Sequence, residues 1–192
     1  MVVVDMPAVE LPTSPRWWTF DDLLALPESI WRFEIVDGAL LMTPPAGLWH
    51  EAVAVLLRDL IKDAARPDVA LGPVAIDIDP TFLIPDLVLL RHEAVRRGGS
   101  KARASDVLLV VEVVSPGSVS NDRILKPAKY AEAGIPHFWR VEFRPELSLT
   151  AYALPAGATT YTEVGTWTAG QTAPIRAPFE VDIEIAELAP DR

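Results

Sequence analysis

Two carboxylates interrupt two of the most apolar stretches of this sequence. Asp86 lies within residues 83–90 and Glu112 within residues 107–114, and both stretches are short and rich in Val and Leu. Such runs are typical of buried strands, where an ionised carboxylate is costly unless a cation or strong hydrogen bonds compensate it. Two such acids predict a metal site, and Lys126 follows nearby. Two acids and a lysine are the components of a metal-dependent phosphodiesterase.

Each of these three residues also has a purely structural interpretation. Asp86 follows a proline and is of a type that often caps a turn, Glu112 is compatible with a structural salt bridge, and Lys126 with an exposed position on a helix. The occurrence of all three in this order favours the functional interpretation over the structural one.

Length and composition predict one globular domain. The chain has 192 residues, half of them hydrophobic, which suffices for a full core. Residues 1–18 contain several prolines and are expected to form an irregular arm, with residues 19–192 as the single domain. No apolar run approaches the ~20 residues that cross a membrane, and no signal peptide is recognisable. The absence of cysteine excludes disulfides, zinc–thiolate sites and thiol nucleophiles, and a cytoplasmic location is expected.

The charge distribution is uneven. A net charge of −10 argues against an extended nucleic-acid footprint. Residues 91–103, which we call the basic segment, are nevertheless dense in cations: Arg91, Arg96, Arg97, Lys101 and Arg103. This segment is either a solvated loop or a rim that contacts phosphates, since Arg and Lys supply most phosphate contacts.

Turn signals and hydrophobic periodicity predict a mixture of helices and strands. Pro127 either begins the third helix or kinks it. The expected helices are one starting at Thr19, one over residues 48–65 and one ending near residue 133; the expected strands are the hairpin 32–42 around Asp37-Gly38, then 69–78, 83–90, 107–114, 137–142, 147–154, 160–167 and 179–185. This order indicates an α/β (α+β) domain with a mixed sheet.

The chain also resembles a known family. The resemblance rests on residues 112–116, Asp122, Lys126, Tyr130 and residues 133–141, and upstream on residues 33–38, Pro44, His50 and residues 85–88. Together these motifs resemble the Uma2 family, a DUF820-type group of endonucleases in the PD-(D/E)XK, or restriction-endonuclease-like, superfamily. The resemblance spans roughly residues 19–145 of the chain, and it is the combined spacing that is specific.

The resemblance implies a restriction-endonuclease-like fold, a central mixed β-sheet flanked by α-helices. It implies that Asp86 and Glu112 are the catalytic acids and that they hold Mg²⁺ or Mn²⁺ together with the backbone carbonyl of Val113. The superfamily usually places a lysine two residues after the second acid, but this chain has Val114 there. Lys126 is the expected substitute, orienting a water or stabilising negative charge.

Four further residues are candidate accessory members of the site: Glu34, His50, Asp122 and Tyr130. Glu34 is either a ligand or an exposed strand acid, and Asp122 either a ligand or an acid in the first turn of a helix. Tyr130 is expected to pack or to position Lys126, and His50 to line the site from its helix.

The leading interpretation is a Mg²⁺-dependent endonuclease that hydrolyses DNA phosphodiester bonds, acting as a homodimer. Two alternatives stay open: a non-catalytic nuclease-fold module with a binding or regulatory role, and a hydrolase of small phosphoesters.

Overall fold

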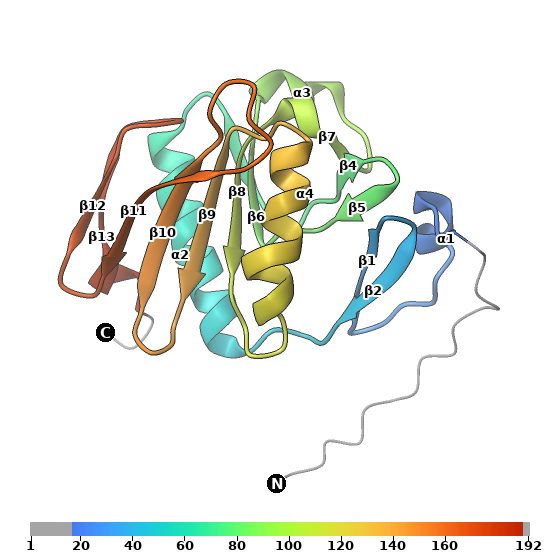
Figure 1. The fold of residues 1–192 in the computed structure, drawn as a ribbon, viewed down its shortest axis with the longest axis horizontal. Coiled ribbons are helices and arrows are strands. Elements are labelled where there is room, and N and C mark those ends of the chain that lie inside the picture. Colours follow the sequence, from blue (N-terminus) through green and yellow to red (C-terminus); the bar gives the residue numbers. More distant parts are fainter. Residues whose placement is uncertain (1–16, 190–192) are drawn as a thin grey trace, which may run out of the picture.

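A six-stranded mixed sheet lies at the centre of the structure, a computed structural model that describes residues 17–189 (Figure 1). Its strands in spatial order are β11 (Thr162–Thr168), β10 (Ser148–Ala153), β9 (His137–Glu142), β8 (Val107–Val113), β6 (Leu87–Leu90) and β3 (Val69–Leu71). Only β8 and β9 run parallel, and the other neighbours are antiparallel. The predicted mixed α+β architecture is therefore confirmed.

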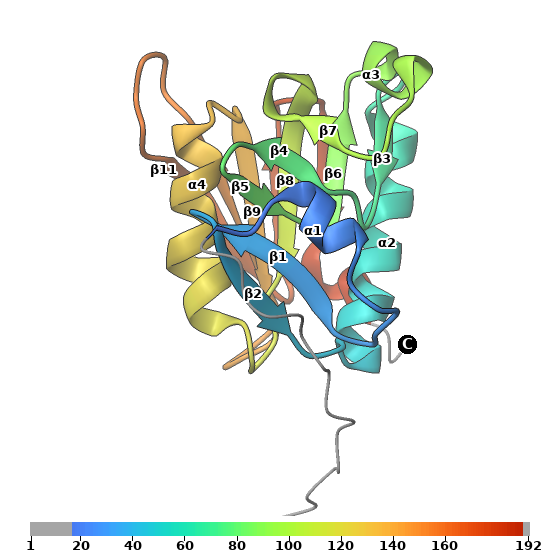
Figure 2. The ribbon, with the colours of Figure 1, turned by 90° about the vertical axis from the view of Figure 1, so that its right-hand side faces the viewer.

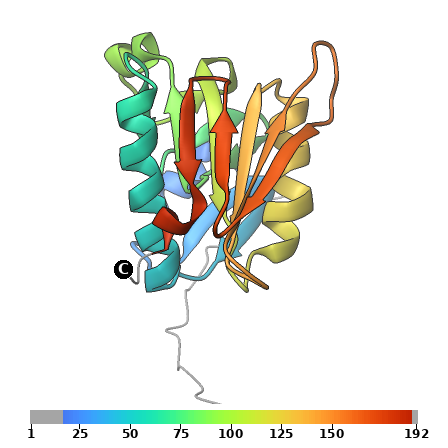
Figure 3. The same ribbon diagram turned by 90° about the vertical axis from the view of Figure 1, so that its left-hand side faces the viewer.

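Both faces of this sheet are covered (Figures 1 and 3). On one face lie the helix α2 (Leu48–Ala64) and the hairpin of β12 (Thr172–Ile175) and β13 (Val181–Glu184), followed by the short helix η3 (Ile185–Leu188). On α2 the buried residues Val53, Leu57 and Ile61 recur at helical spacing. They form one core with the residues that the central strands direct to that face.

The other face is covered by α4 (Lys126–Glu132) and by a second, smaller sheet (Figure 2). The strands of this smaller sheet in spatial order are β2 (Ala39–Thr43), β1 (Arg32–Val36), β5 (Thr81–Leu83), β4 (Ile76–Ile78) and β7 (Ala102–Arg103). The helix α1 (Phe20–Leu24) lies on it and begins at Thr19 with reciprocal side-chain caps between Thr19 and Asp22. The remaining short helices are α3 (His92–Arg97), η1 (Ala104–Asp106) and η2 (Asn121–Leu125).

The hairpin of β1 and β2 forms as the sequence predicts. Asp37 and Gly38 both have positive φ, 49° and 78°, as a two-residue turn of this twist requires. The predicted N-terminal arm lies outside the described residues except for Trp17 and Trp18. Trp18 is buried and packs with Ile35 and Phe82, so at least this residue belongs to the domain.

Two predicted strands are wrong as single strands. Residues 69–78 divide at Gly72-Pro73 into β3 and β4, and residues 83–90 divide at Pro85-Asp86 into β5 and β6. In each case the two halves belong to different sheets. A proline cannot donate a ladder hydrogen bond, and the chain uses each break to cross between the sheets.

The alternation of side chains along β6 and β8 positions the two acids. Leu87 pairs with Val111, so Asp86 lies level with Glu112. Because successive residues of a strand point to opposite faces, Glu112 shares the face of Val110 against α4 and the smaller sheet. The described helices include none that is long and apolar enough to span a bilayer.

Candidate functional site

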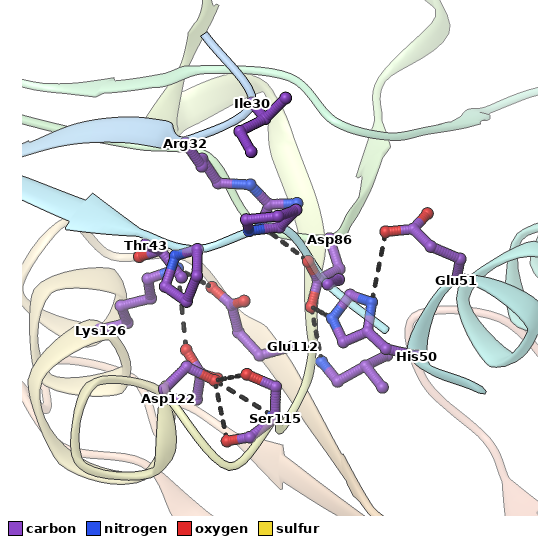
Figure 4. Close-up of a pocket in the computed structure, with 15 residues that line it drawn as sticks. Ile30, Arg32, Thr43, His50, Glu51, Asp86, Glu112, Ser115, Asp122 and Lys126 are labelled. Atoms are coloured by element: carbon purple, nitrogen blue, oxygen red, sulfur yellow. Dashed lines mark hydrogen bonds and ion pairs between the residues drawn. The ribbon is translucent and has the colours of Figure 1, made fainter. Parts of the chain in front are cut away.

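A cavity of about 250 Å³ lies where the two sheets, α2 and the segment before α4 meet (Figure 4). Its lining includes Asp86, Glu112, Asp122, Lys126 and His50, and we call it the acid cavity. Each of these side chains is less than a tenth exposed. Buried charges at this density are uncommon unless they are paired or serve a function.

Asp86 is held by three donors from three parts of the chain. Its Oδ1 accepts a hydrogen bond from Arg32 at 2.8 Å, and its Oδ2 contacts His50 Nε2 at 2.9 Å and the backbone N–H of Val113 at 2.8 Å. Burial alone would raise the pKa of Asp86, but His50 and Arg32 outweigh burial and lower the pKa to about 2. Asp86 is therefore ionised at every physiological pH.

Lys126 lies among three buried carboxylates. Its Nζ is 3.1 Å from Glu34 Oε1, 3.2 Å from Glu112 Oε1 and 3.7 Å from Asp122 Oδ1. Burial opposes the charge on Lys126, but the three acids together raise its pKa above the ordinary value. Lys126 is therefore a permanent cation that can donate hydrogen bonds but cannot accept a proton at neutral pH.

Glu112 has the opposite tendency from Asp86. It is 1% exposed, and burial raises its pKa well above the ordinary value although Lys126 opposes the shift. Tyr130 donates a hydrogen bond of 2.6 Å to Glu112 Oε1. Tyr130 is fully buried in the core, so the expectation that it packs is confirmed, and its hydroxyl positions Glu112.

The backbone before α4 explains how Lys126 returns to the site. Residues Asn121–Leu125 form a wide π-type turn, and Pro127 is then within the first turn of α4. Proline lacks the N–H of a regular helix and clashes with the carbonyl four residues earlier, and a wider turn accommodates both effects. Helical backbone runs without a break from residue 119 through α4, so the prediction that the helix begins at Pro127 is wrong, and the alternative of a helix distorted near Pro127 is the correct one.

Gly72 fixes the backbone at Asp86. A Cβ built on Gly72 would overlap the carbonyl oxygen of Asp86, so no other residue fits without displacing the acid. The break between β3 and β4 is therefore part of the site's construction.

The structure brings all the predicted catalytic, metal and accessory residues together. Glu34 is fully buried, so its interpretation as an exposed strand acid is wrong. Its Oε1 accepts the N–H of Ile84 at 2.7 Å. Val113 lines the cavity, although its predicted role as a metal ligand stays a prediction.

Arg32 is the member that the sequence analysis missed. It carries the cation nearest to Asp86, at 2.8 Å. A signal was present, because Arg32 and Glu34 are two residues apart on a strand and so share one face. A buried Asp86 also requires a cation, and Arg32 is one residue from the motif that begins at Phe33.

The basic segment does not reach the acid cavity. It follows the far end of β6 and forms α3 and β7, at the end of the central strands opposite to the end of β8 (Figure 1). Arg97 pairs with Asp106, and Lys101 pairs with Asp77 at 2.8 Å. Three of the five predicted contacts, Arg97, Lys101 and Arg103, line a separate hollow. The loop interpretation is wrong in form, because Arg96 and Arg97 lie on a helix.

The donor set fits a hard divalent cation. Glu34 Oε2 and Asp122 Oδ1 are buried without a hydrogen-bond partner, and the buried acids outnumber Lys126 and Arg32. Among residues 17–189, however, no three His, Asp or Glu side chains are arranged as a ready set of metal ligands. Mg²⁺ is compatible with this arrangement, since one or two carboxylates and several waters commonly hold it.

The comparisons with known proteins agree with this geometry. A family model described as "Putative restriction endonuclease", Uma2, matches residues 20–188. The chain belongs to the Uma2 family. A crystal structure from Anabaena variabilis ATCC 29413, described as "a putative nuclease belonging to DUF820", superposes with a TM-score of 0.69 at 16% identity, covering 89% of this chain and 97% of that chain. Among curated proteins, no sequence matches. Uma2 membership and the nuclease fold together support a nuclease-like function.

Proposed function

We propose that this protein is a Mg²⁺- or Mn²⁺-dependent endonuclease that hydrolyses DNA phosphodiester bonds at the acid cavity. The observation that carries the proposal is the convergence of Asp86, Glu112 and Lys126, from three separate elements, around one cavity. Asp86, Glu112 and the carbonyl of Val113 would hold the cation. When bound, the cation would supply an activated water and neutralise charge on the phosphoryl group.

The protein's own residues have distinct proposed roles. Lys126 keeps its proton, so its role is to orient a water or stabilise a phosphoryl oxygen, not to act as a general base. Asp86 is held in one orientation by Arg32, His50 and the Val113 N–H. Tyr130 and Lys126 hold Glu112 from the other side. This rigid support is what a catalytic constellation requires.

One observation favours the non-catalytic alternative. Arg32 and His50 already satisfy both oxygens of Asp86, so a cation would have to displace or share these partners. A nuclease-fold module that binds without cutting would retain such pairs unchanged. A hydrolase of small phosphoesters needs no extended surface that binds a nucleic-acid backbone. The separation of the basic segment from the acid cavity is compatible with this second alternative.

Metal-dependent stability tests the proposal. Mg²⁺ or Mn²⁺ at ten times its Kd should stabilise the protein by about 1.4 kcal/mol, a rise in melting temperature of about 3–6 °C for a domain of this size. Glu112→Gln should remove this rise.

Thermal melts with and without EDTA, together with cleavage assays on plasmid DNA and on bis-p-nitrophenyl phosphate, distinguish the endonuclease from the binding module and from the small-phosphoester hydrolase. DNA cleavage supports the proposal, and cleavage of the small ester alone supports the small-phosphoester hydrolase. Metal binding with neither activity supports the binding module, whereas no effect of either metal contradicts the enzyme.

The basic segment is proposed to contact DNA that extends past the cavity. Arg96 makes no ion pair with any described residue, so Arg96→Glu should weaken binding of long DNA and lower the salt slope by about one or two phosphate contacts. Short oligonucleotides, which do not reach α3, should bind as before. Equal affinity of wild type and variant for long DNA at low salt would show that this segment does not contact DNA.

The predicted homodimer is likewise a proposal, which sedimentation of the purified protein tests.

A further inference from the structure

A second hollow adjoins the acid cavity. It is a groove of about 660 Å³, lined by Trp49, Val119, Arg123, Phe143 and Arg144, and we call it the Trp49 groove. His50 and Ser115 line both the groove and the acid cavity. A ligand whose reacting group lies in the acid cavity would therefore continue directly into the groove. Its volume is within the range of sites that bind small organic groups.

The groove presents an exposed aromatic ring in a fixed position. Trp49 is 45% exposed although it is one of the largest apolar side chains. Its ring packs edge-on against Phe143, with centroids 5.7 Å apart and planes at 87°. This edge-to-face contact is a favourable arrangement of two aromatic rings, and it restrains the indole of Trp49. An exposed, restrained aromatic ring beside a catalytic cavity suits stacking with a flat partner.

Two arginines and one acid line the groove, Arg123, Arg144 and Glu142, so its balance of charge is positive, in contrast to the chain as a whole. Arg144 is exposed and makes no ion pair within residues 17–189. Arg123 donates a hydrogen bond of 2.6 Å to Glu142, so its charge is partly neutralised and is less available to an anionic ligand. An apolar wall with a cation at its rim, in a chain of net charge −10, suits a ligand that has a flat face and an anionic group. A nucleotide has both.

We propose that the Trp49 groove binds an unpaired nucleobase next to the phosphodiester in the acid cavity, with the base stacked on Trp49 and the following phosphate near Arg144. This inference rests on the proposed function and specifies its substrate as single-stranded or locally unpaired nucleic acid. A base inside a duplex cannot stack on a protein side chain without leaving its partner, so the groove selects against intact duplex.

Oligonucleotide binding tests the inference. We would measure the affinity of a labelled short single strand and of the matching duplex by fluorescence anisotropy, at low salt in EDTA so that no cleavage occurs. Wild type should prefer the single strand. Trp49→Ala should weaken single-strand binding by about 5- to 100-fold, the usual effect of removing one stacking platform, and Trp49→Phe should restore most of it. Arg144→Ala should lower the salt slope by about one.

Leu48→Ala is the matched control. Leu48 is 90% exposed, precedes Trp49 on the same helix and does not line the groove. The Leu48→Ala variant should therefore bind the single strand with the affinity of wild type. Equal affinity of Trp49→Ala and wild type, or a preference for duplex, would overturn the inference. So would a dimer of the wild type that dissociates in Trp49→Ala, because a second copy would then occupy the groove.

Cleavage assays separate this inference from the proposed function. If wild type cleaves DNA with Mg²⁺ but Trp49→Ala binds single strands normally, the groove proposal fails and the nuclease stands. If single-strand binding depends on Trp49 but no nucleic acid is cleaved, the groove proposal stands and the nuclease fails.

Discussion

Lys126→Met is expected to lower the free energy of unfolding by about 3–5 kcal/mol and any phosphodiesterase activity by two or more orders of magnitude. Methionine keeps most of the volume but removes the cation that faces Glu34, Glu112 and Asp122. Removing one partner of a buried ion pair leaves an uncompensated buried charge, which is the source of such large losses. The loss of activity follows from removing a charge-stabilising donor.

Lys129→Met is the control, because Lys129 lies on the same helix but pairs at the surface with Asp37 and Glu132. Exposed pairs contribute about 0–1 kcal/mol, and Lys129 lies outside the acid cavity. Urea unfolding of both variants at pH 7 gives the comparison, and cleavage of bis-p-nitrophenyl phosphate gives the activity. If Lys126→Met unfolds like Lys129→Met, the buried acids are protonated without the lysine and the electrostatic description of the cavity is incorrect.

Local patterns were sufficient to predict most individual elements. The turn at Asp37-Gly38, the apolar stripe of α2 and the cap at Thr19 each depend on residues that are close in sequence. The buried position of Glu112 also follows from its strand, because the surrounding residues are apolar. The Uma2 family and the nuclease fold were predicted from the resemblance that several motifs carry together, and the grouping of Asp86, Glu112 and Lys126 into one site was implied by the same resemblance.

What the sequence did not predict depends on contacts between distant segments. Arg32 contacts Asp86 across 54 positions of the chain, and no local pattern encodes this pairing. The division of residues 69–78 between two sheets depends on where the chain crosses over. The basic segment is adjacent to Asp86 in sequence, but β6 carries it to the opposite end of the sheet. Proximity in sequence to a candidate site residue was a poor guide to proximity in space.

Asp86→Asn and Glu112→Gln each remove one carboxylate from the same cavity, and their effects on stability should nevertheless depend on pH in opposite directions. In metal-free buffer, Asp86 has a pKa lowered from its ordinary value of 3.8 to about 2 by its partners, which overcome burial. A lowered pKa stabilises the fold by about 2 kcal/mol above pH ~4, and this contribution is lost as the pH falls towards 2. Asp86→Asn should therefore cost about 2 kcal/mol at pH 6 and progressively less below pH ~4.

Glu112 has the opposite linkage, because burial raises its pKa. Its contribution to stability is fully present below its ordinary pKa of 4.5 and is lost as the pH rises through the higher value in the fold. Glutamine resembles the protonated side chain and can still accept from the Tyr130 hydroxyl, so Glu112→Gln should cost little at pH 5 and gain stability relative to wild type as the pH rises.

The titration of His50 limits the pH range in which the stabilities of Asp86→Asn and Glu112→Gln can be compared. Its pKa is raised through its contact with Asp86, against the effect of burial, so its own contribution is present below pH ~6.5 and is lost at higher pH. Urea unfolding of each variant and of wild type between pH 3 and pH 6 therefore compares the two carboxylates below the pH range in which His50 of the wild type loses its proton. Both variants should lose the metal-induced rise in melting temperature and any nuclease activity. If the two variants follow the same pH dependence, then Asp86 and Glu112 are in the same protonation state, and their separate roles in the cavity have to be abandoned.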